Sequence, residues 1–577
     1  MVAELDAPNL SLCVAVTAHR DLVAGEIPGI EDAVSAFFRS LAEDFPGLPL
    51  QLLTPLAEGG DQLAARVAIA QGIPFVAVLP MEQQEYERDF ASAAALSEFR
   101  SLLAAATQVI TLPMAPANDF SPPGGSQAER DRQYAQLGIF ISNHCQVLLA
   151  LWDGKAGRDL GGTGQVVHYH LTAVMEGFQA DSSHASLLAD NENDLVHHIV
   201  CSRDRPGGEV EAGLEALDVS WFSSRQDGTR TKSIPEAYHR MLGRLQQFGR
   251  DWQQKEDTIQ VGSCSLLEGV SGINTPAGAP LTDRFFQAAD GLAVHYQRRV
   301  NSSLRATHAL AILMGVVFLL YSEYDGSRIM VLGFLALFFA GVAMHIIGES
   351  REWHRKYLDY RALAEGLRVQ LYWNLSGVVD SESAGFAYDS FLQKQDVDLG
   401  WIRHVMRLAS MQRDRGCPAD PGGVSWVIDR WIGEPARGEG QLAYYSRKQL
   451  HNTSRFRRTR MLGSLCLWTG ILIALVLFML GGDADEGQRR ALLVLMGVLP
   501  LVAGIWDAYS HKKAEKELIK QYGFMSAVFS RARKLLDESD DLTFQRRVLK
   551  ALGQAALDEG AEWLLMHRER PLEHGRI

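Results

Sequence analysis

Four long apolar runs in the second half of the chain constrain its fold more than any other feature. They cover residues 306–321, 329–348, 461–481 and 491–508, and a short polar turn separates the two runs of each pair. Each run approaches or exceeds the roughly 17 residues that an α-helix needs to cross the hydrocarbon layer of a bilayer. Helices buried inside a soluble protein would explain one such run, but two close pairs favour a membrane. The sequence therefore predicts four transmembrane helices in two hairpins.

The charges that flank these runs predict their orientation. Lys and Arg cluster outside both pairs, for example at 298–305 and 447–460, whereas the turns inside the pairs carry acidic residues at 323–325 and 483–486. Short loops rich in Lys and Arg remain in the cytoplasm, so both termini are expected there. We therefore expect a multi-pass protein of a bacterial inner (plasma) membrane, with the lipid bilayer as a partner.

The N-terminal region has short apolar runs that alternate with helical patterns. The runs that indicate strands are 12–16, 50–53, 75–79, 109–112, 147–151 and 195–201. Strands that alternate with helices predict an α/β domain with a Rossmann-like parallel sheet. In such sheets ligands bind beyond the carboxyl ends of the strands. The polar segments 17–20, 58–61, 153–154 and 161–165 fall at such ends, so they should meet on one rim.

This rim is predicted to bind an anionic ligand. Glycines just before a helix let backbone N–H groups approach an anion, and the helix dipole attracts phosphate. An ordinary glycine-rich turn that caps a helix is the alternative, and His19 could equally bond to its own loop, whereas the guanidinium of Arg20 suits phosphate. The predicted ligand-binding residues are Thr17, His19, Arg20, Glu58, Gly59, Gly60, Asp61, Asp153, Gly154, Gly161, Gly162, Thr163, Gly164 and Gln165.

Three segments together resemble the SLOG superfamily, over about residues 8–205. They are the THRDL loop after the first predicted strand, LAEGGDQLAA after the second, and LLALWDG followed by GGTGQVV. That superfamily includes the LOG nucleotide hydrolases, the DprA fold and the ligand-sensing region of melastatin-type TRP channels. The resemblance implies that the glycine-rich loop holds phosphates and that the loops after the first two strands contact the rest of a nucleotide.

The chain departs from the PGGxGTxxE pattern of the hydrolytic LOG enzymes. Leu160 replaces the Pro, and no carboxylate follows in the next turn. Cleavage of a glycosidic bond needs a placed acid or base, which Glu58 or Asp61 could supply although their spacing does not require it. We therefore expect binding without turnover, with no catalytic residue and no cofactor beyond a nucleotide-derived ligand. His197, His198 and Cys201 fit a strand and lack a fourth ligand, so no metal is expected.

Similar sequences flank the two apolar pairs. Residues 296–299 (YQRR) and 445–448 (YSRK) precede them, and 360–363 (YRAL) and 522–525 (YGFM) follow them. This pattern indicates a weak internal duplication of a helix–hairpin–helix unit. The plan resembles the two-helix SLATT modules, which accompany SLOG domains in bacterial conflict systems and are proposed to form pores. No Asp, Glu, Lys or Arg lies mid-membrane, so a pore would have to be assembled between subunits or appear only after a rearrangement. A homo-oligomer is expected.

The predicted organisation follows from these features. It comprises a SLOG-like nucleotide-binding sensor domain (1–205), a connector with helices (206–304), transmembrane hairpins (305–348 and 461–509) and cytoplasmic helical regions (349–460 and 510–577). We expect a sensor and effector that binds a nucleotide second messenger, such as a cyclic nucleotide or an ADP-ribose-like molecule. The response would be pore formation or membrane disruption, which the SLOG setting places in antiphage defence, with an enzyme that makes the signal as a partner.

Two alternatives remain open at this point. One is a membrane-anchored, LOG-like nucleotide hydrolase, and the other is a non-enzymatic membrane scaffold with a vestigial pocket. The formal net charge of −13 gives no reason to expect nucleic acid as a partner.

Overall fold

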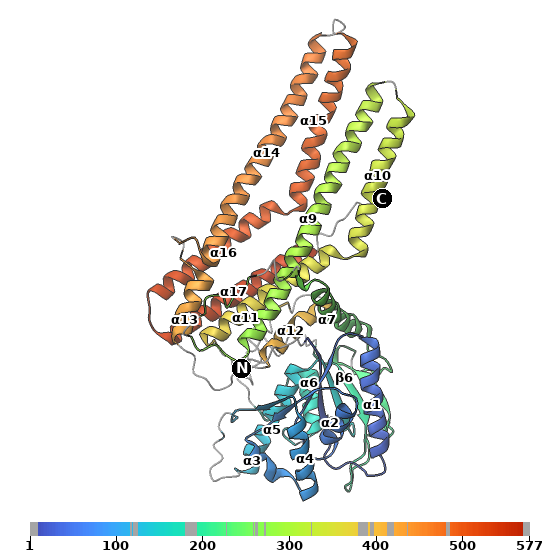
Figure 1. The fold of residues 1–577 in the computed structure, drawn as a ribbon, viewed down its shortest axis with the longest axis vertical. Coiled ribbons are helices and arrows are strands. Elements are labelled where there is room, and N and C mark those ends of the chain that lie inside the picture. Colours follow the sequence, from blue (N-terminus) through green and yellow to red (C-terminus); the bar gives the residue numbers. More distant parts are fainter. Residues whose placement is uncertain are drawn as a thin grey trace.

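The structure is a computed structural model in which an α/β domain and two helical hairpins lie at opposite ends, with a layer of helices between them (Figure 1). It describes residues 10–115, 118, 125–157, 159–178, 193–226, 228–257, 259, 264–270, 273–324, 326–378, 391–392, 397–411, 421–434, 437–480 and 485–568.

The α/β domain is built on one seven-stranded sheet in the order β4-β3-β2-β1-β5-β6-β7. The strands are β1 (Leu12–Ala18), β2 (Leu50–Thr54), β3 (Phe75–Leu79), β4 (Gln108–Thr111), β5 (Val147–Trp152), β6 (Val196–Val200) and β7 (Val219–Phe222). All neighbouring strands run parallel except β6 and β7. The predicted parallel α/β sheet is confirmed. Its central strands are continuous apolar runs because helices cover both of their faces.

The last strand was not predicted, because it lies in the segment expected to be a connector. β7 pairs with β6 in an antiparallel ladder, so the sheet continues past residue 205. Its Trp221 packs edge-on against His197 of β6, with ring centroids 4.4 Å apart, and His197 stacks on Phe37. β7 thus covers what would otherwise be an open sheet edge.

Helices flank the sheet and lead from it to the intermediate layer. Those of the α/β domain are α1 (Ile27–Asp44), α2 (Gly60–Ala70), α3 (Gln83–Tyr86), η1 (Glu87–Asp89), α4 (Ala93–Ala105), α5 (Gln127–His144), α6 (Thr163–Thr172) and η2 (Ser224–Gln226). The intermediate layer contains α7 (Glu236–Gln254), α11 (Trp353–Ser376), η4 (Val397–Leu399), α12 (Gly400–Ser410), α13 (Pro421–Val427), η5 (Ile428–Ile432), α16 (Glu515–Asp537) and α17 (Leu542–Arg568). One continuous hydrophobic core extends from the sheet into this layer.

Within the described ranges, four helices are long and apolar enough to cross a membrane, which supports a membrane protein. They are α9 (Ala279–Glu323), α10 (Arg328–Ser350), α14 (Gly440–Leu480) and α15 (Glu486–Lys512). Their most apolar windows are at most 6% buried within the chain, so these side chains need another apolar environment. The first helix of each hairpin runs without interruption from the intermediate layer to the tip (Figure 1).

The two hairpin units repeat one arrangement, as the flanking sequences predict. After each hairpin a single residue with left-handed backbone, Glu352 or Ala514, turns the chain into the next helix, and φ is +50° at both. α11 then packs against α9, and α16 packs against α14. The tyrosine of each leading motif meets the tyrosine of the corresponding trailing motif. The ring centroids of Tyr296 and Tyr360 are 5.8 Å apart, and those of Tyr445 and Tyr522 are 6.1 Å apart.

The hairpins contact each other where α9 and α15 run side by side. A Cβ added at Gly315 of α9 would lie 2.3 Å from Leu501 of α15, and one added at Gly497 of α15 would lie 2.9 Å from Leu319 of α9. At each glycine, a leucine side chain of the other helix therefore packs against the helix backbone. This is the close helix approach that small residues permit inside membranes.

Candidate functional site

The predicted rim segments converge where the strand order of the sheet reverses, between β1 and β5. The backbone N–H of Gly60, after β2, donates to the carbonyl of His19, after β1, at 3.1 Å. The hydroxyl of Thr163, at the start of α6, donates to the carbonyl of Ala18 at 3.0 Å. This reversal is the usual ligand position in open α/β sheets, so the convergence fits the prediction. The binding role of these residues remains a prediction.

His19 and Asp153 hold the β1 and β5 loops together. The backbone N–H of Asp153 donates to Nε2 of His19 at 3.2 Å, and the Asp153 carboxylate oxygen Oδ1 lies 3.2 Å from the same nitrogen. Burial lowers the pKa of His19, although the nearby Asp153 carboxylate opposes that change. The imidazole is therefore neutral at pH 7, and the contact is a polar tie between loops rather than an ion pair.

The glycines of the rim approach other backbone segments closely. A Cβ at Gly59 would lie 2.3 Å from the carbonyl oxygen of Arg20, and one at Gly161 would lie 2.7 Å from the backbone nitrogen of Ala135 in α5. Gly59 and Gly161 also have positive φ, +89° and +76°. At Gly164 the space is filled by the 155–157 loop, whose Gly157 nitrogen would be 2.6 Å from an added Cβ. Packing within the chain is therefore sufficient to require glycine at these positions.

Other predicted residues bond to their own surroundings. Gln165 accepts from the N–H of Gly161 at 2.8 Å and donates to the carbonyl of Glu176 at 2.8 Å, so it braces the glycine-rich loop. Glu58 accepts from the N–H of Ala91 at 3.1 Å. Thr17 is buried within β1. Gly154 has a φ of +88° and faces the 211–214 segment. Gly162 forms the N-cap of α6 with extended backbone.

Arg20 and Asp61 are two predicted residues whose charges interact with each other at the rim. Arg20 is exposed, and its guanidinium carbon lies 5.2 Å from the ring centre of Tyr134 on α5. Asp61, at the start of α2, is 4% exposed, and its Oδ1 has no hydrogen-bond partner in the described part of the chain. Burial raises the pKa of Asp61 to about 8, although the positive charge of Arg20 opposes this. A buried carboxyl oxygen without a partner is costly, so this position is a candidate contact for a ligand.

Sequence reasoning missed the residues that complete this cluster. The hydroxyl of Tyr134 donates to Asp89, and Arg130 donates to both carboxylate oxygens of Asp89 at 2.7 Å. These residues come from α5 and η1, not from strand ends, so the strand-end rule does not find them. The available signal was the polar composition of the helix over 127–144, which nevertheless buries Gln133 and Gln136.

Comparison of the chain with models of known protein families gives no match, and comparison with curated proteins gives none either. Within the described ranges, no group of three or more His, Cys, Asp and Glu side chains could hold a metal ion. Function therefore has to be inferred from the geometry of the chain itself.

Proposed function

We propose that this protein is a membrane-bound sensor and effector, in which a nucleotide-derived anion binds at the rim of the sheet and changes the packing of the two hairpins. The observation that carries the proposal is the position of exposed Arg20 and of buried, incompletely bonded Asp61, whose charges interact, beside the reversal of strand order. A guanidinium suits a phosphate, and a protonated carboxyl can donate to a base or a sugar hydroxyl. The resemblance to SLOG and SLATT modules is the basis for proposing antiphage defence.

A chain of contacts from the α/β domain to the first hairpin supports a coupled response, and it begins at Pro46 in the loop before β2, at the amino ends of the strands. α7 bonds to the α/β domain through Gln246, whose side-chain amide donates to the carbonyl of Pro46 at 2.8 Å. Arg244 of the same helix donates to both carboxylate oxygens of Glu352 at 3.0 Å. Glu352 is the left-handed residue that ends the first hairpin, and Lys356 just after it pairs with Asp251 of α7 at 2.8 Å. A movement of α7 would therefore act directly on the base of this hairpin.

The ligand part of the proposal predicts a thermal shift. The full-length protein in detergent is melted with cyclic nucleotides, ADP-ribose and ATP in turn. A ligand at a hundred times its dissociation constant should stabilise the folded protein by about 2.7 kcal/mol. Arg20→Gln should remove the shift, because it removes the charge offered to phosphate, whereas Arg39→Gln at an exposed position on α1 should keep it. If no nucleotide shifts the melting temperature, the sensor proposal fails and a scaffold with a vestigial pocket is favoured.

A hydrolase is the second candidate, and Asp61 is the observation that favours it. With its pKa raised to about 8 by burial, this carboxyl carries a proton at neutral pH, as an acid catalyst must. Incubation of the protein with the same nucleotides would then release free base, and Asp61→Asn would stop the release while the melting temperature stays near that of the parent. If a nucleotide binds but no free base is released, the hydrolase is excluded and the sensor is favoured.

The membrane part of the proposal predicts that the glycine–leucine contacts set how the hairpins pack. Gly315→Leu should force α9 and α15 apart, because even a Cβ at this position would meet Leu501 at 2.3 Å. Adding Leu501→Gly in the same chain should restore the parent geometry. The measurement is the distance between spin labels at Arg328→Cys and Arg489→Cys, at the two tips, in a chain without its native cysteines. Gly333→Leu, where an added Cβ meets nothing within 4 Å, is the control. Equal distance distributions in all variants would contradict the prediction.

A further inference from the structure

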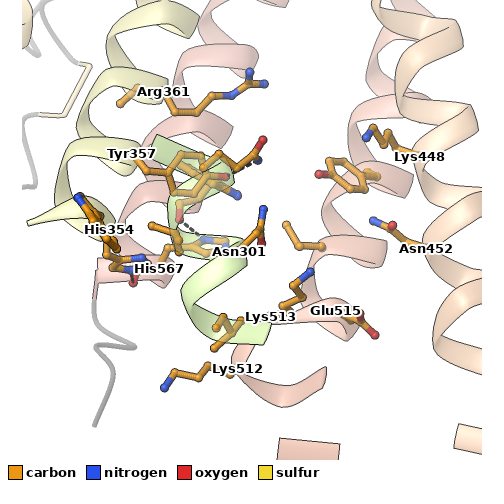
Figure 2. A pocket seen from close by; sticks show the side chains of 18 of the residues that line it. Asn301, His354, Tyr357, Arg361, Lys448, Asn452, Lys512, Lys513, Glu515 and His567 are labelled. Carbon is orange, nitrogen blue, oxygen red and sulfur yellow. Dashed lines mark hydrogen bonds between the residues drawn. The ribbon is translucent and has the colours of Figure 1, made fainter. Parts of the chain in front are cut away.

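A cavity of about 450 Å³ lies where the two hairpin units meet the intermediate layer. Its walls come from α9, α10, α11, α14, α15, α16 and α17, and therefore from both repeats. Figure 2 shows Arg361 of α11 and Lys448 of α14 on opposite walls, with Lys512 and Lys513 at one end of the cavity. The apolar stretches of all four long helices begin or end near this level, so the cavity lies at the cytoplasmic edge of the proposed membrane.

The charges around the cavity are unbalanced toward positive. Arg361 pairs with Glu365, and Arg455 pairs with Glu515 at 3.4 Å. The lysines Lys448, Lys512 and Lys513 form no ion pair with a carboxylate in the part of the chain that the structure describes. The Lys448 and Lys513 ammonium groups instead lie 5.6 and 5.0 Å from the ring centres of Tyr444 and Tyr509.

Glu559, the third acidic residue that lines the cavity, carries less negative charge than an ordinary glutamate. Burial, together with the nearby Glu365 carboxylate, raises the pKa of Glu559 to about 7. A substantial fraction of Glu559 is therefore uncharged at neutral pH. Glu365 and Glu515 pair with arginines, so among the described residues that line the cavity the positive charges outnumber the negative ones.

A groove of mixed lining adjoins this basic space and shares Arg455 with it. Leu450, Leu462 and Trp506 supply its apolar surface, and His451, Ser454, Arg458 and Thr459 supply its polar surface. Leu462 of α14 and Trp506 of α15 are exposed, at 51% and 46%. Both lie within the apolar runs, and Lys512 and Lys513 lie just outside them, whereas Lys448 lies about 20 Å further along α14 from the membrane. A basic compartment next to a groove with exposed apolar side chains, at the edge of the proposed membrane, suits a molecule that is anionic at one end and apolar at the other.

We propose that the cavity holds the headgroup of an anionic phospholipid of the cytoplasmic leaflet, with its phosphate among Lys448, Lys512 and Lys513 and an acyl chain along Leu462 and Trp506. The bound lipid joins the two hairpin units at their bases. This inference requires the membrane placement of the hairpins but not the nucleotide site on the sheet. A soluble phosphate has the same headgroup chemistry but no acyl chain, so the two sources can be distinguished.

The test uses the full-length protein, delipidated in dodecyl maltoside, and native mass spectrometry to measure lipid binding. Phosphatidylglycerol is expected to bind, and phosphatidylcholine of the same chain length to bind much more weakly. Each basic residue near a membrane surface contributes roughly fivefold to the affinity for an anionic lipid. Lys448→Gln with Lys512→Gln should therefore weaken phosphatidylglycerol binding roughly 30-fold. Lys534→Gln, at a lysine that is 78% exposed on α16, is the matched control and should leave binding unchanged.

Two further measurements identify the source of the phosphate and check the fold. Glycerophosphoglycerol, the deacylated headgroup, and inorganic phosphate should not displace phosphatidylglycerol at millimolar concentration. If either does so completely, or if phosphatidylcholine binds equally well, the lipid proposal is overturned. It is also overturned if the double lysine variant elutes and melts like the parent yet binds phosphatidylglycerol unchanged. Failure of the nucleotide site leaves all these outcomes unaffected, so the two proposals can fail separately.

Discussion

Gly161→Ala is expected to destabilise the α/β domain by about 2–5 kcal/mol whether or not a ligand binds there. A left-handed backbone costs an alanine about 1–2 kcal/mol, and a forced overlap in a packed region costs about 1–3 kcal/mol more. Both apply, because φ is +76° and the new Cβ would lie 2.7 Å from the backbone of α5. Net stabilities of domains are only about 5–15 kcal/mol, so much of the folded protein would be lost. Urea titration of the full chain, followed by near-ultraviolet circular dichroism, measures the change.

Gly47→Ala is the matched control for this loss of stability. Gly47 has a similar φ of +84°, but an added Cβ would meet nothing within 4 Å. It should therefore cost only the backbone part, about 1–2 kcal/mol. If Gly161→Ala proved no more destabilising than Gly47→Ala, the glycine-rich loop would be able to open away from α5, as a phosphate cradle requires. A loss of ligand binding in a variant of the glycine-rich loop can be attributed to the binding site only after the stabilities of Gly161→Ala and Gly47→Ala have been compared.

The elements that the sequence predicted are those whose signal is local. β3 and β5 are continuous apolar runs, and the four long helices are longer ones, so burial on all sides can be read from neighbouring residues alone. β7 has only four residues, and it forms because Trp221 packs on His197 of β6, a contact between distant segments. No local pattern predicts such a partner.

In the candidate site, too, some residues could be predicted from the sequence and others could not. Strand ends predicted that Arg20 and Asp61 would lie on one rim, because topology alone brings parallel strand ends together. Tyr134 reaches Arg20 from α5, whose position depends on the packing of the whole domain. Likewise the lysines at 448 and 512 looked only like flanking charges that orient the hairpins. Their shared cavity arises from the packing of two repeats that are distant in sequence.

His197→Phe is expected to make the protein more stable than the parent at pH 5 by about 2 kcal/mol and to change its stability little at pH 7. Burial lowers the pKa of His197 to about 3, with a further contribution from His198. Its two ring nitrogens have no partner among the described residues, and the ring stacks on Phe37 at 4.3 Å, so a phenyl ring suits the space. Between pH 6.5 and 3 the unfolded chain binds a proton that the folded protein does not, and stability therefore falls as the pH falls.

The size of the effect follows from the width of that window. Each pH unit below 6.5 costs the parent about 1.4 kcal/mol through this one residue, and phenylalanine removes the cost. His170 and His198, whose pKa values burial lowers to about 4, respond in the same direction and remain in both proteins, so they cancel from the difference. Urea titrations at pH 7 and pH 5 measure it, and His168→Gln, exposed on α6, should show no such difference. If the difference in unfolding free energy between the variant and the parent did not change with pH, His197 would bind a proton in the folded state. β7 would then cover His197 less completely than its packing indicates.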